Sequence, residues 1–180
     1  MTGTVTAILG ALLLAGASTL GDFIWAHFSL EHRPTYGLIH GTLLCAVIGL
    51  YLGLLRKRPV PGAVGGAIIG FGAAAGFYLL ARLAGMAAMF PLWMVFWIAF
   101  ALLDARVLID HAIRPATIRN ALVRGAVAAV ASGLAFYAIS DIWLDRSPGG
   151  PYYGVNFVSW TVAFLPGFLA LLAGPARAGR

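Results

Sequence analysis

Long apolar runs, separated by short groups of proline, glycine and charged residues, make up most of the chain. A helix rises about 1.5 Å per residue and must cross about 30 Å of hydrocarbon, so about 20 apolar residues can span a membrane. Six stretches are close to this length, and each predicts a membrane-spanning helix. They are Val5–Ile24, Gly37–Leu55, Ala63–Leu83, Met86–Leu103, Leu122–Ile142 and Val155–Leu172.

The breaks between these stretches are made of residues that end helices. Pro59 and Pro61 separate the second stretch from the third, Gly85 interrupts the third and fourth, and residues 147–151 (Ser-Pro-Gly-Gly-Pro) separate the fifth from the sixth. The sequence Ala15-Gly16-Ala17 resembles the cleavage site of a signal peptide, but no lysine or arginine precedes the first apolar run. We therefore expect a membrane helix there.

Composition excludes a soluble globular protein and a disordered chain. Hydrophobic residues make up 61% of the 180 positions and charged residues 10%, and the mean hydropathy is +0.92. Soluble domains are about 45–50% apolar and about 25% charged, and disordered chains are more polar still. We predict an all-α integral membrane bundle that forms a single domain over residues 1–180. Cys45 is the only cysteine, which excludes an intrachain disulfide.

Basic residues are distributed unequally between the two sides of the predicted spans. Nine of the twelve lie on one side: Arg56, Lys57, Arg58, Arg106, Arg114, Arg119, Arg124, Arg177 and Arg180. The other side has Arg33, Arg82 and Arg146. Cytoplasmic loops carry the excess of basic residues, so we predict that both termini are cytoplasmic. This basic rim faces anionic lipid headgroups, and its charge calls for no nucleic-acid partner.

Small residues recur at every fourth position in three of the predicted helices. The second carries Gly37, Gly41, Cys45, Gly49 and Gly53; the third Gly62, Gly66, Gly70 and Ala74; and the fifth Gly125, Ala129 and Gly133. Such stripes let helix backbones approach closely in a membrane. They predict packing within the bundle or, alternatively, an interface between copies of the chain.

The fourth predicted helix carries a face of large aromatic residues. Phe90, Trp93, Phe96, Trp97 and Phe100 recur at steps of three and four residues. This face meets lipid or fills the bundle or, alternatively, forms the wall of an apolar ligand pocket. Pro166, in the middle of the sixth predicted helix, favours a pocket because a proline that kinks a membrane helix opens space beside it.

The middle of every predicted span lacks acidic, basic and histidine residues, which disfavours a coupled ion transporter. Milder polar residues take these places: Thr42, Cys45, Tyr78, Ser132, Tyr137, Ser159 and Thr161. Acids and histidines gather instead at the non-cytoplasmic side: Asp22, His27, Glu31, His32, His40, Asp141 and Asp145. They predict a polar network at helix ends or, alternatively, a metal or acid–base site, although no ligand motif is present.

On the cytoplasmic side, Asp104 ends the fourth predicted span. It either pairs with Arg106 or Arg124, or positions a lipid headgroup or a partner. The loop that follows has an apolar face, which predicts a short interfacial helix; its residues are Val107, Leu108, Ile109 and Ile113.

Three segments resemble the Insig family of six-span membrane proteins. Gly41-Thr42, followed by Ala46-Val47-Ile48-Gly49-Leu50, is similar to a family stretch, and Leu103-Asp104-Ala105-Arg106 is similar to the site of the family's functional aspartate. Phe136-Tyr137, Ser147-Pro148 and Ser159-Trp160 follow in a similar order. Two differences are that Ala105 separates the aspartate from its arginine, and that the long N-terminal segment of animal members is missing.

The resemblance implies a non-enzymatic protein that binds a sterol- or diacylglycerol-like lipid in an intramembrane cavity, forms a homotrimer and has membrane-protein partners. It implies a bacterial relative, in the inner membrane, with no cofactor. The predicted ligand-binding residues are Trp93, Phe96, Trp97, Phe100, Asp104, Tyr137, Trp160 and Pro166. The alternatives are a membrane enzyme that uses the outer acids and histidines, and an accessory subunit of a larger membrane complex.

Overall fold

The computed structural model describes residues 3–28, 30, 34–109, 115–144 and 152–172, and this part of the chain is helical without strands. Its six long helices are α1 (Gly3–His27), α2 (Pro34–Leu55), α3 (Pro59–Ala84), α4 (Met89–Leu103), α5 (Pro115–Leu144) and α6 (Tyr153–Leu172). A 3₁₀ turn, η1 (Gly85–Ala88), precedes α4, and a π-helical segment, η2 (Asp104–Ile109), extends it. Each predicted span has its helix, and all six are long and apolar enough to cross a membrane.

Proline begins three of these helices, which corrects the expected boundaries. Pro34, Pro59 and Pro115 are the first residues of α2, α3 and α5. The first amide groups of a helix have no partner within it, so proline fits there although it lacks an N–H. As a result, α3 and α5 start four and seven residues earlier than the apolar pattern indicated.

The segment after α4 also differs from our expectation. In place of a separate interfacial helix, η2 continues α4, and Ala105 and Leu108 are buried. Ile113, the last residue of the expected apolar face, lies outside the described residues. The helical path is therefore continuous from Met89 to Ile109, and the candidate membrane span runs to Leu108.

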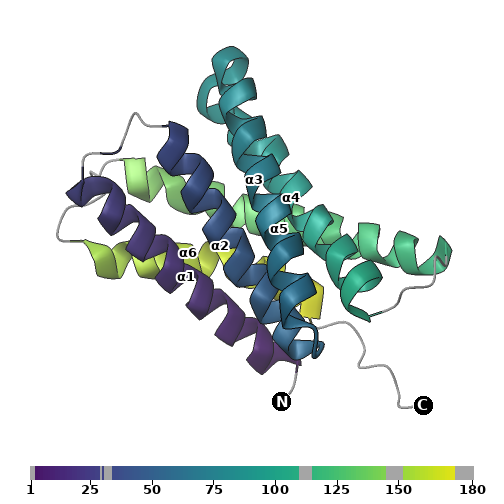
Figure 1. Cartoon of the computed structure of the whole chain (residues 1–180). Coiled ribbons are helices and arrows are strands. Elements are labelled where there is room, and N and C mark those ends of the chain that lie inside the picture. The colour runs from purple at the N-terminus through teal and green to yellow at the C-terminus, as the bar shows by residue number, and fades with distance from the viewer. Residues whose placement is uncertain (1–2, 29, 31–33, 110–114, 145–151, 173–180) are drawn as a thin grey trace.

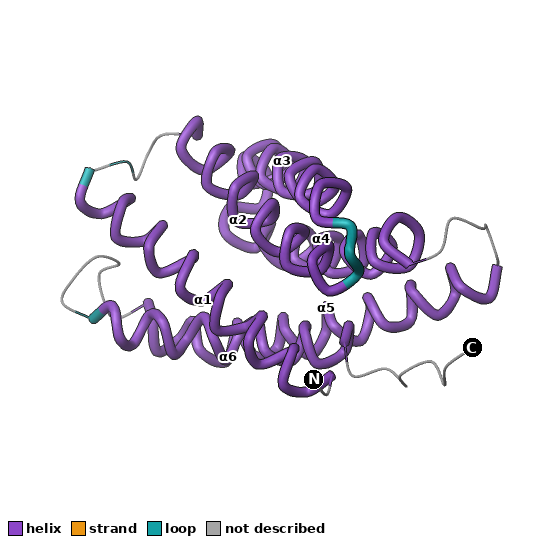
Figure 2. The backbone as a smooth tube through the Cα atoms, turned by 60° about the horizontal axis from the view of Figure 1, so that its bottom comes forward, coloured by secondary structure: helices purple, strands orange, loops and turns teal. Residues whose placement is uncertain are grey.

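The long helices pack in a closed order. Each packs against the next along the chain, and α6 returns to pack against α1. Figure 1 and Figure 2 both show α1 lying along α6, and α2 lying along α3. The start of α1, the end of α2 and the start of α3 lie at the same end of the bundle, at the bottom of Figure 1.

The small-residue stripes of α2 and α3 pack against each other within the chain. A Cβ atom added to Gly66 would overlap the carbonyl group of Cys45, and one added to Gly62 would overlap that of Gly49. Further along, a Cβ on Gly41 would lie 3.0 Å from the Cβ of Ala74. The backbones of these two helices thus lie in direct contact, which confirms the expectation of packing within the bundle.

Aromatic rings fill the core between α4 and α6. Trp97 and Phe100 of α4, and Phe164 and Phe168 of α6, are each at most 1% exposed. The ring of Trp97 occupies the space that a side chain at Gly167 would need. This close approach fixes the position of α4 against α6.

Candidate functional site

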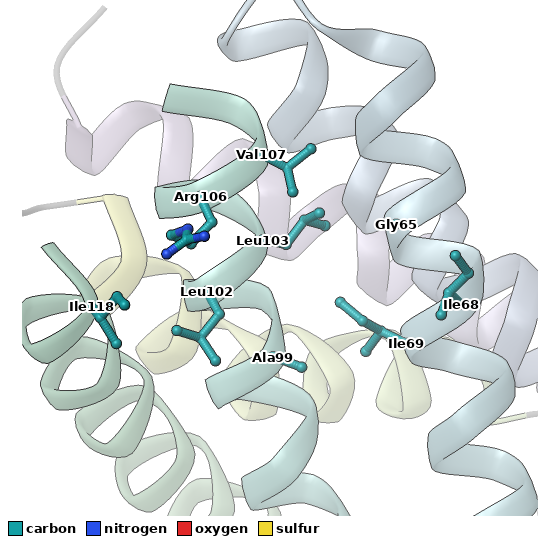
Figure 3. A pocket seen from close by; sticks show the side chains of 9 residues that line it. All are labelled: Gly65, Ile68, Ile69, Ala99, Leu102, Leu103, Arg106, Val107 and Ile118. Atoms are coloured by element: carbon teal, nitrogen blue, oxygen red, sulfur yellow. The ribbon is translucent and has the colours of Figure 1, made fainter. Parts of the chain in front are cut away.

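An apolar groove with a volume of about 430 Å³ crosses the surface of α4 and η2 (Figure 3). In Figure 3, the side chains from α3 lie on one side of it and Ile118 of α5 on the other, with Leu102 between them. The lining residues are Gly65, Ile68, Ile69, Ala99, Leu102, Leu103, Arg106, Val107 and Ile118. From Ala99 to Val107 the helical path rises about 12 Å. The groove therefore follows α4 for about two turns from its η2 end.

Arg106 is the one charged residue among those that line the groove. Its side chain extends from η2 toward Ile118 of α5 (Figure 3). Its Nε atom is buried and has no hydrogen-bond partner among the described residues. A buried donor without an acceptor is unusual, because it has lost its bond to water and gained none in return.

A second arginine approaches the same end of the groove from the turn between α2 and α3. Lys57 has a φ of 59° there, and the amide of Arg58 donates to the carbonyl of Gly53 over 2.7 Å, so α2 ends in a left-handed cap. The side chain of Arg58 then donates from Nη1 to the carbonyl oxygen of Val107, a lining residue. The turn thus places a guanidinium group beside η2.

Asp104 pairs with Arg56, so the expected partners Arg106 and Arg124 were wrong. The Nε of Arg56 donates to Oδ1 over 2.9 Å and Nη2 donates to Oδ2 over 3.1 Å. Arg106 lies two residues further along the helical path and so faces another direction. Arg124 donates to the carbonyl of Ala170 over 3.4 Å. The contact joins the end of α2 to η2.

The aromatic residues of α4 that we predicted to bind a ligand point into the bundle. Phe96, Trp97 and Phe100 are buried, and Trp93 stacks on Phe164 of α6 with ring centroids 5.5 Å apart. None of them lines the groove. Their contact with a ligand stays a prediction.

Ser132 connects this aromatic face to the neighbouring helices. Its Oγ accepts a hydrogen bond from Nε1 of Trp93 over 3.2 Å and donates to the carbonyl of Ala163. Ser132 is completely buried on α5, so one hydroxyl joins α4, α5 and α6. In this structure the mild polar residue that we singled out serves helix packing.

The remaining predicted ligand-binding residues lie apart from the groove. Tyr137 on α5 is 40% exposed and lies beside Phe90, with ring centroids 5.7 Å apart. Trp160 on α6 stacks on Phe164 at 5.4 Å. Pro166 lies inside α6, which continues to Leu172. Asp104 is absent from the groove lining as well, and both of its oxygens bind Arg56.

A polar cluster joins α1, α2 and α6 at the opposite end of the bundle. The indole Nε1 of Trp160 donates to Oδ2 of Asp22 over 2.8 Å, and the hydroxyl of Tyr36 donates to the carbonyl of Gly21 over 2.7 Å. The ring of His40 occupies the space next to Gly21. These contacts correspond to the polar network that we expected at helix ends.

The other acids and histidines of this end are only partly described. His27 is exposed and stacks on Phe23 at 5.4 Å. Glu31, His32 and Asp145 lie outside the described residues, as does the side chain of Asp141. Within the described part of the chain, no three histidine, cysteine, aspartate or glutamate residues come together as metal ligands.

Sequence reasoning missed the groove because its lining carries no distinctive pattern. Leucine and isoleucine on α3 and α4 look the same whether they face lipid, a neighbouring helix or a cavity. The one signal that could have indicated the groove was Arg106, a charged residue that follows Leu102 by one helical turn and directly precedes Val107. We counted that residue in the basic rim and interpreted it as a partner for Asp104.

Comparison with known proteins adds no relative. No family model matches the chain, and no curated protein or solved structure matches it. The six candidate spans indicate a multi-pass membrane protein. The resemblance to the Insig family stays a prediction.

Proposed function

We propose that this chain is a multi-pass protein of a bacterial inner membrane that binds one membrane lipid, without catalysis, in the groove across α4 and η2. The observation that carries the proposal is the groove itself. Its volume of about 430 Å³ falls within the range of small-molecule sites, about 300–1,000 Å³. Eight of its nine lining residues are apolar or glycine, as the tail of a lipid requires.

The position of the groove favours a lipid over a water-soluble ligand. Ile68 is 68% exposed and Val107 is 37% exposed, so the groove opens on the outer surface of the bundle. All nine lining residues belong to the candidate membrane spans. A lipid of the surrounding membrane can therefore reach the groove directly.

The resemblance to the Insig family also implies lipid binding without catalysis. It adds a sterol or diacylglycerol as the lipid, and a homotrimer as the assembly. Both additions belong to the proposal. The structure supports lipid binding on another face of α4 than the aromatic one that we first considered. The partner proteins of the animal family members remain an analogy.

Native mass spectrometry of the protein in mild detergent tests the proposal and counts the chains in the assembly. We expect one bound lipid per chain. The variant Leu102→Trp fills the groove and should lower lipid occupancy at least about tenfold, which corresponds to about 1.4 kcal/mol. Leu134→Trp is the matched control, because Leu134 is a 65% exposed residue of α5 that does not line the groove.

Equal lipid loss in both variants would assign the effect to general destabilisation, and unchanged lipid in Leu102→Trp would place the lipid elsewhere. A wild-type protein without lipid would refute the proposal.

A further inference from the structure

We infer that the groove selects an anionic phospholipid, whose phosphate is bound by the guanidinium group of Arg106 while an acyl chain lies against the apolar lining. The inference rests on the proposed function. It adds the chemical class of the lipid and the residue that recognises it.

The first argument is the unsatisfied donor at the end of an apolar groove. The buried Nε of Arg106 has no acceptor among the described residues, and the residues around it in the lining are aliphatic. A phosphate diester offers acceptor oxygens in the geometry that a guanidinium group binds with two parallel hydrogen bonds. Such a ligand would satisfy Arg106 without displacing any contact of the structure.

The second argument is the balance of charge around the groove. Among the described residues, Asp104 is the one acidic residue at this end of the bundle. Arg56 already binds both of its carboxylate oxygens. Arg58 reaches the carbonyl of Val107 and adds a second positive group beside the lining. Two guanidinium groups attract a lipid of net negative charge and repel the cationic part of a zwitterionic headgroup.

The third argument is the height of Arg106 in the bundle. It lies two residues before Leu108, where the candidate span ends, whereas Ala99 lies about 10 Å deeper along the helix. A phosphate at Arg106 would therefore lie at the level of the headgroups, and a chain running toward Ala99 would enter the hydrocarbon. This is the orientation that a phospholipid already has in the leaflet.

A competition experiment tests this selectivity. The protein is mixed with equal amounts of phosphatidylglycerol, phosphatidylcholine and diacylglycerol that carry the same acyl chains, and the bound lipids are counted by native mass spectrometry. We expect phosphatidylglycerol to exceed phosphatidylcholine at least about tenfold in the wild type. Arg106→Gln should reduce this preference to about twofold or less.

Arg119→Gln is the matched control, because it removes one positive charge from an exposed residue of α5 that does not line the groove. It should keep the wild-type preference. Arg106→Lys keeps the charge without the two-pronged geometry and should give an intermediate preference, so it tests the inference even if Arg106→Gln folds poorly.

Each other outcome has a definite meaning. An unchanged preference in Arg106→Gln, or equal binding of the three lipids by the wild type, would overturn the inference and leave the proposed function intact. Absence of any bound lipid would overturn both. A lipid-free oligomer in which cysteines at Ile68→Cys cross-link two copies would assign the groove to a second chain and also overturn both.

Discussion

At the scale of single residues, the contact between Arg56 and Asp104 joins parts of the chain that are 48 positions apart through two hydrogen bonds. The Asp104 side chain is 3% exposed and that of Arg56 is 32% exposed. Both carboxylate oxygens receive a hydrogen bond, which offsets the cost of removing the charge from water. The link holds η2, and with it Arg106, against the turn between α2 and α3.

We expect Asp104→Asn to destabilise the fold, because it leaves the Arg56 guanidinium without a counter-charge. Removing one partner of a buried pair costs about 3–5 kcal/mol, and partial exposure of Arg56 places the expected loss near or below about 3 kcal/mol. Denaturant titration in mixed micelles, followed by circular dichroism, measures the loss.

The double variant Arg56→Gln with Asp104→Asn distinguishes a specific pair from two independent effects. If the two residues act as a pair, the double variant should be less destabilised than the sum of the single variants. Strict additivity would contradict the contact. Arg119→Gln, an exposed arginine of α5, is the control for a general loss of charge.

At the scale of helices, the contact between α2 and α3 depends on glycine at particular positions. Gly66 lies against the carbonyl group of Cys45, whereas a Cβ added to Gly72 on the same helix meets nothing within 4 Å. Gly66→Ala should therefore separate the helices and cost about 1–3 kcal/mol. Gly72→Ala should be neutral or stabilise α3 by up to about 1 kcal/mol.

The same unfolding titration applied to both glycine variants checks this expectation. Since the substitution is the same and the helix is the same, helix propensity cancels in the comparison. Equal stabilities for the two variants would mean that α2 and α3 do not touch at Gly66.

The helices and their small-residue stripes could be predicted because each is a local, periodic property of the sequence. The starts at Pro59 and Pro115 were missed because hydropathy does not register a polar or proline-containing first turn. The partner of Asp104 could not be predicted, since it depends on how α2 and η2 lie in register across 48 positions of sequence.

The site was harder to predict than the fold for a related reason. Large aromatic residues on α4 indicate a densely packed surface, but the pattern alone does not say whether rings or a ligand pack there. In the structure, α6 presents Gly167 to Trp97, so the rings of the chain itself fill that face. The groove lies elsewhere on α4, where α3 and α5 stand on either side of Leu102.

At the scale of the whole molecule, exposed apolar side chains indicate a membrane environment, and the uneven distribution of basic residues indicates an orientation in it. α3 alone exposes Ile68, Phe71, Leu79 and Leu83, each by more than half. Such a surface is stable in contact with lipid and not with water. The groove lies toward the end of the bundle that carries Arg56, Lys57 and Arg58. The orientation in the membrane therefore decides which leaflet would supply the lipid that we propose.

We predict that this basic end faces the cytoplasm, because nine of the twelve lysine and arginine residues lie on that side of the spans. Two variants, each with one cysteine added to the wild-type chain, test it with a membrane-impermeant thiol reagent on intact cells. Phe28→Cys, at a 63% exposed residue of the opposite end, should react from outside. Lys57→Cys, at an exposed residue, should react only after permeabilisation.

The wild-type chain is the internal control for this labelling, because its one cysteine, Cys45, is 4% exposed between α2 and α3 and should stay unmodified. Labelling of Lys57→Cys from outside, with Phe28→Cys protected, would reverse the orientation. Arg106 would then face the outer leaflet, and the anionic lipid that we propose for it would have to come from there. The topology experiment thus determines which leaflet's lipids should be compared with the lipid preference measured by native mass spectrometry.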